Sequence, residues 1–368
     1  MNLDLGNKEW KEFLFIDIFD IKKGYYNKKP KSSNQGIIPF LSASQFNNGI
    51  SEFYTISEIE NASKTGDNKN DHPIEDKIFK GNCIAVTNNG SVGYAFYQKI
   101  DFTCSHDINP LYLKNHTLNS ILAKFLITTI EAQRVCFEYA RKWRPQRMVK
   151  SKILLPSNSK GEPDYDFMEQ YIRHKEQEKK NDYQSFIESR LQELKNTHKT
   201  VELNEKEWGE FFLNEVFQEI QRGKRLKKAD HKEGKKPYIS STGSNNGLDG
   251  YVGNKERVRV FKNCITLANS GSVGSCFYQP YSFVASDHVT KLENKNFNKS
   301  INLFISSIVL RLGEKYSFNR EMNDTRIKRE KIMLPINANN QPDYDFMENY
   351  MKNLEYKKLS EYLAFKKN

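Results

Sequence analysis

The sequence predicts an α+β fold built by internal duplication of a mixed α/β domain, with a long helix after each copy. NNGSVGYAFYQ at residues 88–98 returns as NSGSVGSCFYQ at 269–279, and PDYDFME at 163–169 returns unchanged at 342–348. These copies keep their order and lie about 180 residues apart, which indicates two domain-sized repeats rather than a solenoid. Within each copy, short β-rich runs give way to a charged segment without glycine or proline.

The first part of each copy predicts several strands and one longer helix. Short apolar runs bounded by Gly, Asn, Ser and Pro are typical of strands. Such runs lie at 36–41, 83–87, 94–97, 265–268 and 275–278. Around 119–134 and 301–312 the apolar pattern becomes longer and more helical, which predicts a helix in each copy.

The last part of each copy predicts a long amphipathic helix. From 165 to about 199, and from 344 onward, apolar residues recur at steps of three and four among dense charges. Pro163 followed by Asp164 is a typical helix start, because an aspartate caps free backbone N–H groups. A helix of about 35 residues would be about 50 Å long and would act as a spacer. A solvated charged helix without a partner is the alternative.

These features divide the chain into four predicted segments. They are a mixed domain at 1–160, a long helix at 161–203, a second mixed domain at 204–340 and a second, shorter helix at 341–368.

Composition favours a cytoplasmic protein. Hydrophobic residues make up 37% of the 368 residues, mean hydropathy is −0.76, and the apolar-rich stretch 301–312 is too short and too polar to span a bilayer. The start, MNLDLGNKEW, lacks the apolar core of a secretory signal. Five scattered cysteines without a CxxC pair are typical of a reducing compartment. We therefore expect no membrane partner.

The net charge of +11 favours a polyanionic partner, most often nucleic acid. Basic residues gather in YARKWRPQRMVK at 139–150, in QRGKRLKKADHKEGKK at 221–236 and at 22–31. Polar loops that end in Asn-Asn-Gly accompany them at 39–49 and 237–247. Their side chains can contact phosphates or base edges. A solvated charged surface and simple turns are the alternatives.

The candidate DNA contacts come from these segments, from the two loops around GSVG and from 320–326. In the first copy they are Lys23, Lys28, Lys29, Ser42, Ser44, Asn47, Asn88, Asn89, Ser91, Arg141, Lys142, Arg144, Gln146 and Arg147. In the second copy they are Arg222, Lys224, Arg225, Lys227, Lys228, Ser241, Thr242, Asn245, Asn269, Ser270, Ser272, Arg320 and Arg326.

The paired glycines of GSVG raise the question of a phosphate-binding loop. No Gly-Lys-Ser/Thr follows them, and the next residues are few and aromatic, so a turn between two strands is favoured. NPLY at 109–112 lacks the second proline of an adenine methyltransferase motif. The His-Asp pair at 106–107 returns as Asp-His at 287–288, which favours a polar turn over a catalytic pair. The residues predict no catalytic site and no metal site.

Both copies resemble the target-recognition domains of the DNA specificity subunits of restriction-modification systems. The resemblance rests on EWxEF near the start of each copy, the PYISSTGSNNG loop at 237–247, the NCITLANSGSVGSCFYQ segment at 263–279, the KIxLP strand and the PDYDFMExY helix start. It covers essentially the whole chain. The first copy departs from the pattern between 24 and 76, where it carries a longer insert rich in Lys and Asn.

The resemblance implies a non-catalytic subunit of a type I system or of the similar type IIB systems. Each domain would enter the major groove of double-stranded DNA at one half of a bipartite site. The two helices would pack as an antiparallel coiled coil that sets the gap and docks methyltransferase subunits, two in number. S-adenosylmethionine would be bound by those subunits, and ATP and Mg²⁺ by a restriction and motor subunit, with no cofactor on this chain. A self-sufficient nuclease or methyltransferase and a stand-alone DNA-binding or decoy protein are the alternatives.

Overall fold

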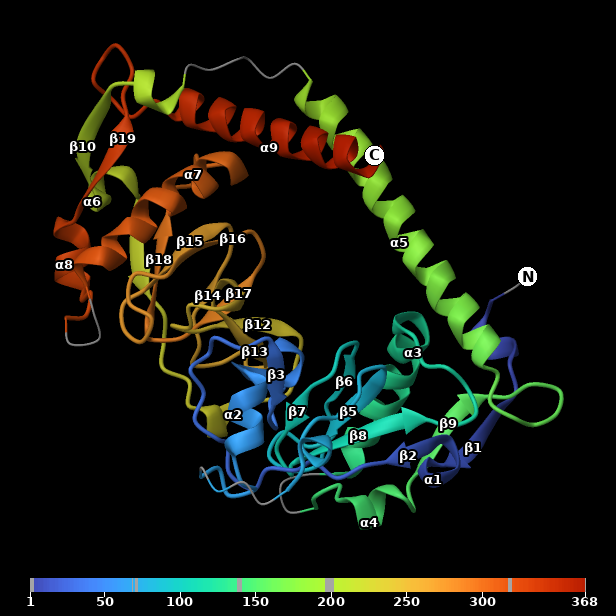
Figure 1. Cartoon of the computed structure of the whole chain (residues 1–368). Coiled ribbons are helices and arrows are strands. Elements are labelled where there is room, and N and C mark those ends of the chain that lie inside the picture. Colours follow the sequence, from blue (N-terminus) through green and yellow to red (C-terminus); the bar gives the residue numbers. More distant parts are fainter. Residues whose placement is uncertain are drawn as a thin grey trace. The chain divides into compact units, whose positions relative to one another are not determined.

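The computed structural model describes residues 3–67, 69, 72–137, 141–195, 202–316 and 320–367. The chain divides into two compact units, Met1–Tyr183 (unit 1) and Gln184–Asn368 (unit 2), and the boundary falls inside one long helix. Figure 1 shows strands and helices mixed within each unit and the long helices α5 and α9 after them. The α+β class predicted from the sequence is confirmed.

Unit 1 is built around a four-stranded antiparallel sheet in the order β2-β8-β5-β6. Its strands are β2 (Phe19–Ile21), β5 (Cys83–Thr87), β6 (Ala95–Gln98) and β8 (Ile108–Leu113). Every residue of β5 is buried, and its side chains alternate between two faces. Ile84 and Val86 join the core that contains helix α3 (Ser120–Glu131), whereas Cys83 and Ala85 join a second core. The continuous apolar run of β5 therefore reflects cover on both faces.

A smaller sheet, in the order β4-β3-β7, contributes to the second core. It consists of β3 (Ile38–Leu41), β4 (Ile50–Tyr54) and β7 (Thr103–Cys104). β3 and β7 are parallel, and Leu41 and Cys104 pack with Cys83 in one cluster. Helix α1 (Phe15–Ile18) precedes β2, and α2 (Ile56–Asn61) follows β4.

The first and last strands of the mixed domain pair with each other. β1 (Trp10–Leu14) runs antiparallel to β9 (Lys152–Pro156), with Trp10 opposite Pro156. Ile153 and Leu155 of β9 are fully buried in the main core, as is Met148 of the short helix α4 (Pro145–Met148). The chain therefore enters and leaves this domain at neighbouring points.

Helix α5 (Tyr165–Leu194) begins where the sequence predicted it. An oxygen of the Asp164 carboxylate accepts a hydrogen bond from the backbone N–H of Phe167 at 3.0 Å, which is the expected cap. The other oxygen accepts one from the ammonium group of Lys8 at 2.6 Å, and that ammonium also lies over the Phe167 ring. The helix ends at Leu194, earlier than the predicted end near 199, and 196–201 lie outside the described residues.

Unit 2 repeats this topology, with a fourth strand in the smaller sheet. Its sheets have the orders β11-β18-β15-β16, β13-β12-β17-β14 and β10-β19. The elements are β10 (Trp208–Phe212), α6 (Leu213–Val216), β11 (Glu219–Arg222), β12 (Lys236–Ile239), β13 (Leu248–Val252), β14 (Val260–Phe261), β15 (Cys264–Ala268), β16 (Cys276–Gln279), β17 (Phe283–Ala285), β18 (Val289–Glu293), α7 (Lys299–Val309), α8 (Asp324–Arg329), β19 (Lys331–Pro335) and α9 (Tyr344–Lys367). β15 takes the place of β5, and β10 pairs with β19 as β1 does with β9. The predicted internal duplication is confirmed.

Within unit 2, the last turns of α5 pack against α9. Figure 1 shows the two helices running in opposite directions where they meet, consistent with the predicted antiparallel coiled coil. Ile187 and Leu194 on this part of α5 are buried. Helix α9 also packs on α7, where Phe304 meets Tyr350 edge to face. The end of α5 is thereby joined to the core of unit 2.

Among the described residues, no helix combines the length and the apolar character needed to cross a membrane. All five cysteines are free, and four of them are buried. Burial raises the pKa of Cys83 and of Cys264 to about 12, so these thiols stay protonated at neutral pH.

Candidate nucleic-acid interface

The GSVG loop of each unit is a tight turn between two antiparallel strands. In unit 1 the turn joins β5 to β6, and Gly93 has a φ of +81°. A Cβ at Gly93 would lie 2.6 Å from Cγ of Arg134. In unit 2 Gly274 has a φ of +86°, and a Cβ there would lie 2.2 Å from Cα of Gly313. Both positions therefore require glycine, and the prediction of a strand turn rather than a nucleotide loop is confirmed.

A buried asparagine at the head of each turn joins it to the loop before β8 or β18. The side chain of Asn88 donates to the backbone carbonyl of His106 at 3.0 Å and to Oδ1 of Asn109 at 2.6 Å. Its backbone N–H donates to the carbonyl of Asp107 at 2.8 Å. The backbone N–H of Asn269 makes the equivalent bond to His288 at 3.0 Å. These asparagines hold two loops together in each unit.

Three of the candidate DNA contacts are buried in this arrangement. Asn88, Asn269 and Ser270 are only 1%, 2% and 5% exposed. Because their side chains lie inside the loop scaffold, they hold the loops in position. The remaining candidates are at least partly exposed.

The segments before α4 and α8 pack onto the same loops. The backbone N–H of Trp143 donates to the carbonyl of Asn88 at 3.1 Å, and that of Met322 donates to the carbonyl of Asn269 at 3.0 Å. The side chains of Trp143 and Met322 are both fully buried. Trp143 and Met322 are therefore equivalent positions, although one is aromatic and the other is not.

This equivalence matches basic residues between the two units. The matched pairs are Arg141 with Arg320, Arg147 with Arg326, Lys150 with Arg329 and Lys152 with Lys331. The guanidinium of Arg141 lies 5.6 Å from the centre of the Phe137 ring, and that of Arg320 lies 5.4 Å from the centre of the Tyr316 ring. Arg147 and Arg326 each donate to a backbone carbonyl five residues earlier, at 2.8 and 2.6 Å. We call these eight residues the matched cations.

In unit 1 the matched cations line a cavity of about 750 Å³. Its lining residues are Glu12, Gln133, Cys136, Phe137, Arg141, Gln146, Arg147, Lys150, Ser151, Lys152 and Leu154. Glu12 is paired with Lys152 at 2.6 Å, as Glu210 is with Lys331 at 3.0 Å in unit 2. The cavity therefore keeps a net positive charge, which suits a phosphate group.

Most of the other predicted basic residues lie in the segments that follow β2 and β11. Arg222 is the last residue of β11, and Lys142 and Arg144 come just before α4. Lys23, Lys28, Lys29, Lys224, Arg225, Lys227 and Lys228 are exposed, and Arg222 is partly exposed. Two of them form ion pairs with acidic residues: Lys29 pairs with Glu52 at 2.6 Å, and Arg222 pairs with Asp324 at 3.0 Å. Arg225 lies 3.7 Å from a carboxylate oxygen of Asp287, beside the GSVG loop of unit 2.

The polar loops after β3 and β12 adjoin the GSVG turns. The backbone N–H of Ser272 donates to the carbonyl of Ser241 at 3.0 Å. In unit 1 a Cβ at Gly90 would lie 3.3 Å from Cβ of Ala43. Asn47 and Asn245 have φ angles of +52° and +50°, so they are turn residues as well as exposed amides. The structure thus brings together the predicted polar loop and the predicted GSVG loop in each unit.

The family model for the type I restriction modification DNA specificity domain matches residues 7–183 and 205–362. The chain belongs to this family.

The relatives match over most of their length. The chain is 30% identical over 354 residues to the specificity subunit S.BcgI of a type II restriction enzyme from Heyndrickxia coagulans, covering 95% of both chains. It is 23% identical to a protein of Mycoplasma pneumoniae described as a type I specificity subunit, covering 87% of this chain and 83% of that one. The solved S subunit of a type I system from M. genitalium matches with a TM-score of 0.42 and 18% identity, over 99% of this chain and 93% of that chain.

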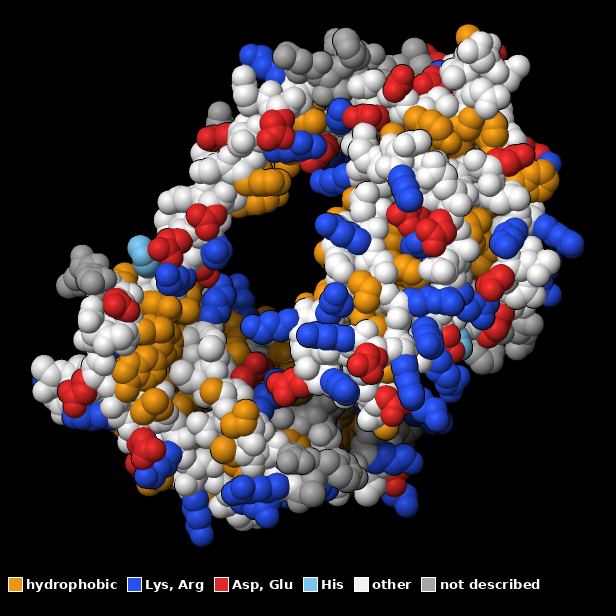
Figure 2. Space-filling view, turned by 180° about the vertical axis from the view of Figure 1, so that it is seen from behind, with side chains coloured by type: hydrophobic (Ala, Val, Ile, Leu, Met, Phe, Trp, Pro, Cys, Tyr) orange, Lys and Arg blue, Asp and Glu red, His pale blue; other side chains and the backbone are white. Residues whose placement is uncertain are grey.

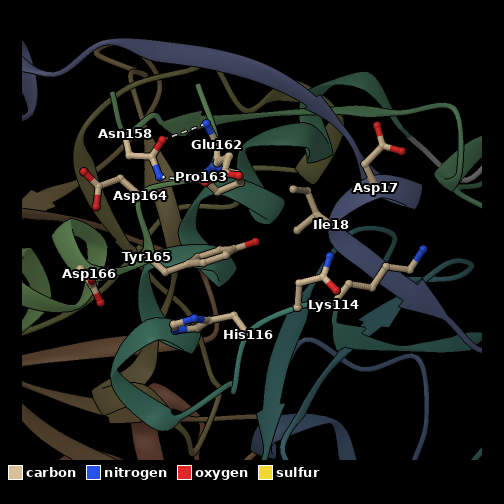
Figure 3. A pocket seen from close by; sticks show the side chains of 11 residues that line it. Asp17, Ile18, Lys114, His116, Asn158, Glu162, Pro163, Asp164, Tyr165 and Asp166 are labelled. Carbon is tan, nitrogen blue, oxygen red and sulfur yellow. Dashed lines mark hydrogen bonds between the residues drawn. The ribbon is translucent and has the colours of Figure 1, made fainter. Parts of the chain in front are cut away.

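The first specificity domain also contains a cavity of about 370 Å³ beside the start of α5 (Figure 3). Asp17, Glu162, Asp164 and Asp166 give it an acidic lining. The carboxylate of Asp164 is occupied by the helix cap and Lys8, and His116 stacks on Tyr165 with ring centres 4.6 Å apart. In the described part of the chain, no three His, Cys, Asp or Glu side chains are placed to hold a metal ion. We interpret this cavity as the junction between the specificity domain and its helix.

Two groups of exposed residues were missed or set aside by the sequence reasoning. Lys152, Arg329 and Lys331 complete the matched cations together with Lys150 of the predicted basic segment 139–150, and the repeated KIxLP strand could have pointed to Lys152 and Lys331. The side chains of Asp107 and His288 lie beside the GSVG loops, where the sequence favoured a simple polar turn. Figure 2 shows many lysine and arginine side chains over the second specificity domain, with acidic side chains among them.

Proposed function

We propose that this chain is the DNA-recognition subunit of a restriction-modification complex and that each specificity domain recognises one half of a bipartite site. The observation that supports this most directly is the duplication of one basic surface beside one loop scaffold. Trp143 and Met322 fix the matched cations against Asn88 and Asn269 in the same way in both domains. Two similar surfaces on one chain suit a target with two separate half-sites.

The matched cations are suited to the DNA backbone. Arginine and lysine at phosphates supply most of the affinity of DNA-binding proteins, and such contacts carry no sequence information. A contact that is independent of sequence can stay the same in two domains that recognise different sequences. The candidate residues in the loops after β2, β3, β11 and β12 complete the proposed surface.

We further propose that the long helices set the gap between half-sites and bind methyltransferase subunits, two in number, with a restriction and motor subunit completing the complex. Leu354, Tyr356 and Phe365 on α9 are 37%, 41% and 79% exposed, which supports a protein partner along this helix. The boundaries 1–160, 161–203, 204–340 and 341–368 separate the recognising and spacing parts in this proposal. S-adenosylmethionine, ATP and Mg²⁺ then belong to the partner subunits.

Mapping of methylated bases tests the proposal. The chain is co-expressed with its methyltransferase subunit in cells without other methylation, and methylated adenines are located by sequencing. We expect a motif in two parts with a fixed gap, and no methylation when the methyltransferase is expressed alone. A contiguous motif, or methylation that does not depend on this chain, would contradict the proposal.

A type II and a type I specificity subunit are both similar to this chain. The partner subunits that co-purify with the co-expressed chain should therefore be identified. A type I system would yield separate methyltransferase and restriction subunits, whereas a fused methylase-nuclease would indicate a type IIB system. The self-sufficient alternative is tested by incubating the purified chain alone with DNA and either Mg²⁺ or S-adenosylmethionine. We expect neither cleavage nor methylation. A chain that binds DNA but retains no methyltransferase would favour a stand-alone binding protein.

A further inference from the structure

We propose that one side chain beside the GSVG loop of each specificity domain selects bases: Asp107, held by Asn89, in the first, and His288, held by Ser270, in the second. This inference rests on the proposed function and names residues within its DNA surface. The side-chain amide of Asn89 donates to Oδ1 of Asp107 at 2.9 Å. The hydroxyl of Ser270 is hydrogen-bonded to Nδ1 of His288.

The two pairs occupy the same place in the fold. Residues 89 and 270 follow the buried asparagines at the head of each GSVG turn. Asp107 and His288 are the residues whose carbonyls accept the backbone N–H of Asn88 and Asn269, at 2.8 and 3.0 Å. The hydrogen bond between the side chains therefore spans the same two loops in both domains, and only its chemistry differs.

The two pairs consist of different residue types although the loops that carry them are joined in the same way. The matched cations, in contrast, keep their positive charge in both domains. If a pair served only to join the loops, the same residue types could stand in both domains, as they do at the buried asparagines. A pair that contacts base edges must differ if the half-sites differ. The side chains remain accessible, since Asp107 and His288 are 23% and 51% exposed.

The chemistry of each pair indicates which bases it suits. The Asp107 carboxylate only accepts hydrogen bonds, so it suits the amino group of cytosine or adenine in the major groove. When the Ser270 hydroxyl donates to Nδ1 of His288, Nε2 carries the proton and can donate to O6 or N7 of guanine.

Asp107→Asn tests the first pair with the least disturbance. The substitution keeps the size of the side chain and an oxygen for the Asn89 amide, but it adds an amide donor, and asparagine favours adenine. The full chain with its methyltransferase subunit selects duplexes from a library in which both half-sites are randomised, and the bound DNA is sequenced. Asp101→Asn is the matched control, because Asp101 is a surface carboxylate of the same domain that pairs with Lys80 at 2.9 Å.

We expect Asp107→Asn to change the preferred base at one position of one half-site by about tenfold or more and to leave the other half-site unchanged. Asp101→Asn should give the wild-type motif. An unchanged motif, or equally weaker binding to every sequence, would overturn the inference and leave the pair as a loop brace. If wild-type protein selects no two-part motif, the proposed function itself fails. His288→Gln applies the same test to the second half-site and decides the matter if Asp107→Asn does not fold.

Discussion

The guanidinium of Arg190 on α5 donates two hydrogen bonds to the carboxylate of Glu355 on α9, with Nε–Oε1 at 3.0 Å and Nη2–Oε2 at 2.9 Å. Both side chains are 25% exposed, so water screens the pair only in part. Paired contacts of this kind are among the stronger charged interactions in proteins. This contact joins the end of the first long helix to the second within unit 2.

Loss of the pair should destabilise the contact between the helices in a manner that depends on pH. The hydrogen bond from Arg190 lowers the pKa of Glu355 below its ordinary value. A carboxyl group with a lowered pKa in the folded state contributes stability above its unfolded pKa of about 4.3 and loses it as pH falls through the folded pKa. We expect Glu355→Gln to cost about 1 kcal/mol at pH 7 and much less at pH 3, measured by urea unfolding. An equal cost at both pH values would contradict the role of the charge.

Gly274→Ala should destabilise unit 2, because the new Cβ would lie 2.2 Å from the backbone of Gly313 at a φ of +86°. We expect a cost of about 2 kcal/mol or more in thermal or urea unfolding. Gly250→Ala is the control, since a Cβ at Gly250 meets nothing within 4 Å. Equal stability of the two variants would show that the GSVG turn can relax.

Arg144→Ala and Arg225→Ala should each weaken DNA binding and reduce its dependence on salt. Removing one phosphate contact lowers the slope of log K against log salt by about 1. The binding constant of the full chain, with its methyltransferase, should be measured at several salt concentrations. Lys80→Ala serves as the control, because Lys80 is an exposed cation outside the proposed interface. A residue whose removal leaves both affinity and slope unchanged does not belong to the interface.

Arg147→Ala and Arg326→Ala should have similar effects, because these arginines occupy equivalent positions in the two specificity domains. Each variant should bind all sequences more weakly by a similar factor and retain the wild-type motif. Selection from the randomised library would reveal any altered base preference. A changed motif in either variant would mean that this position recognises bases.

Much of the fold could be predicted from the sequence because its strands and helices have strong local patterns. The run 83–87 coincides with β5, since every position there is apolar or small and both faces are covered. The helix start at Asp164 was predictable from a capping residue after a proline, and the hydrogen bond to Phe167 confirms it. The end of α5 was less predictable because its charged sequence contains no helix-breaking residue.

The surface was harder to predict, because hydrogen bonds between distant segments decide which polar side chains are exposed. Asn88 and Asn89 are adjacent residues of the same type, yet Asn88 is buried by contacts with residues about twenty positions later. The match between Trp143 and Met322 depends on a backbone hydrogen bond and not on similar side chains. Sequence comparison between the copies therefore found the basic clusters but not their full correspondence.

The pairing of β1 with β9, and of β10 with β19, means that each specificity domain meets the rest of the chain at two adjacent points. A different domain whose first and last strands pair in the same way could replace either specificity domain. The length of the helix that follows would not change. Half of a recognition sequence could then be exchanged in a single recombination event, while the spacing and the partner subunits are kept. The architecture thus favours the evolution of new specificities by replacement of whole domains, with single substitutions refining them afterwards.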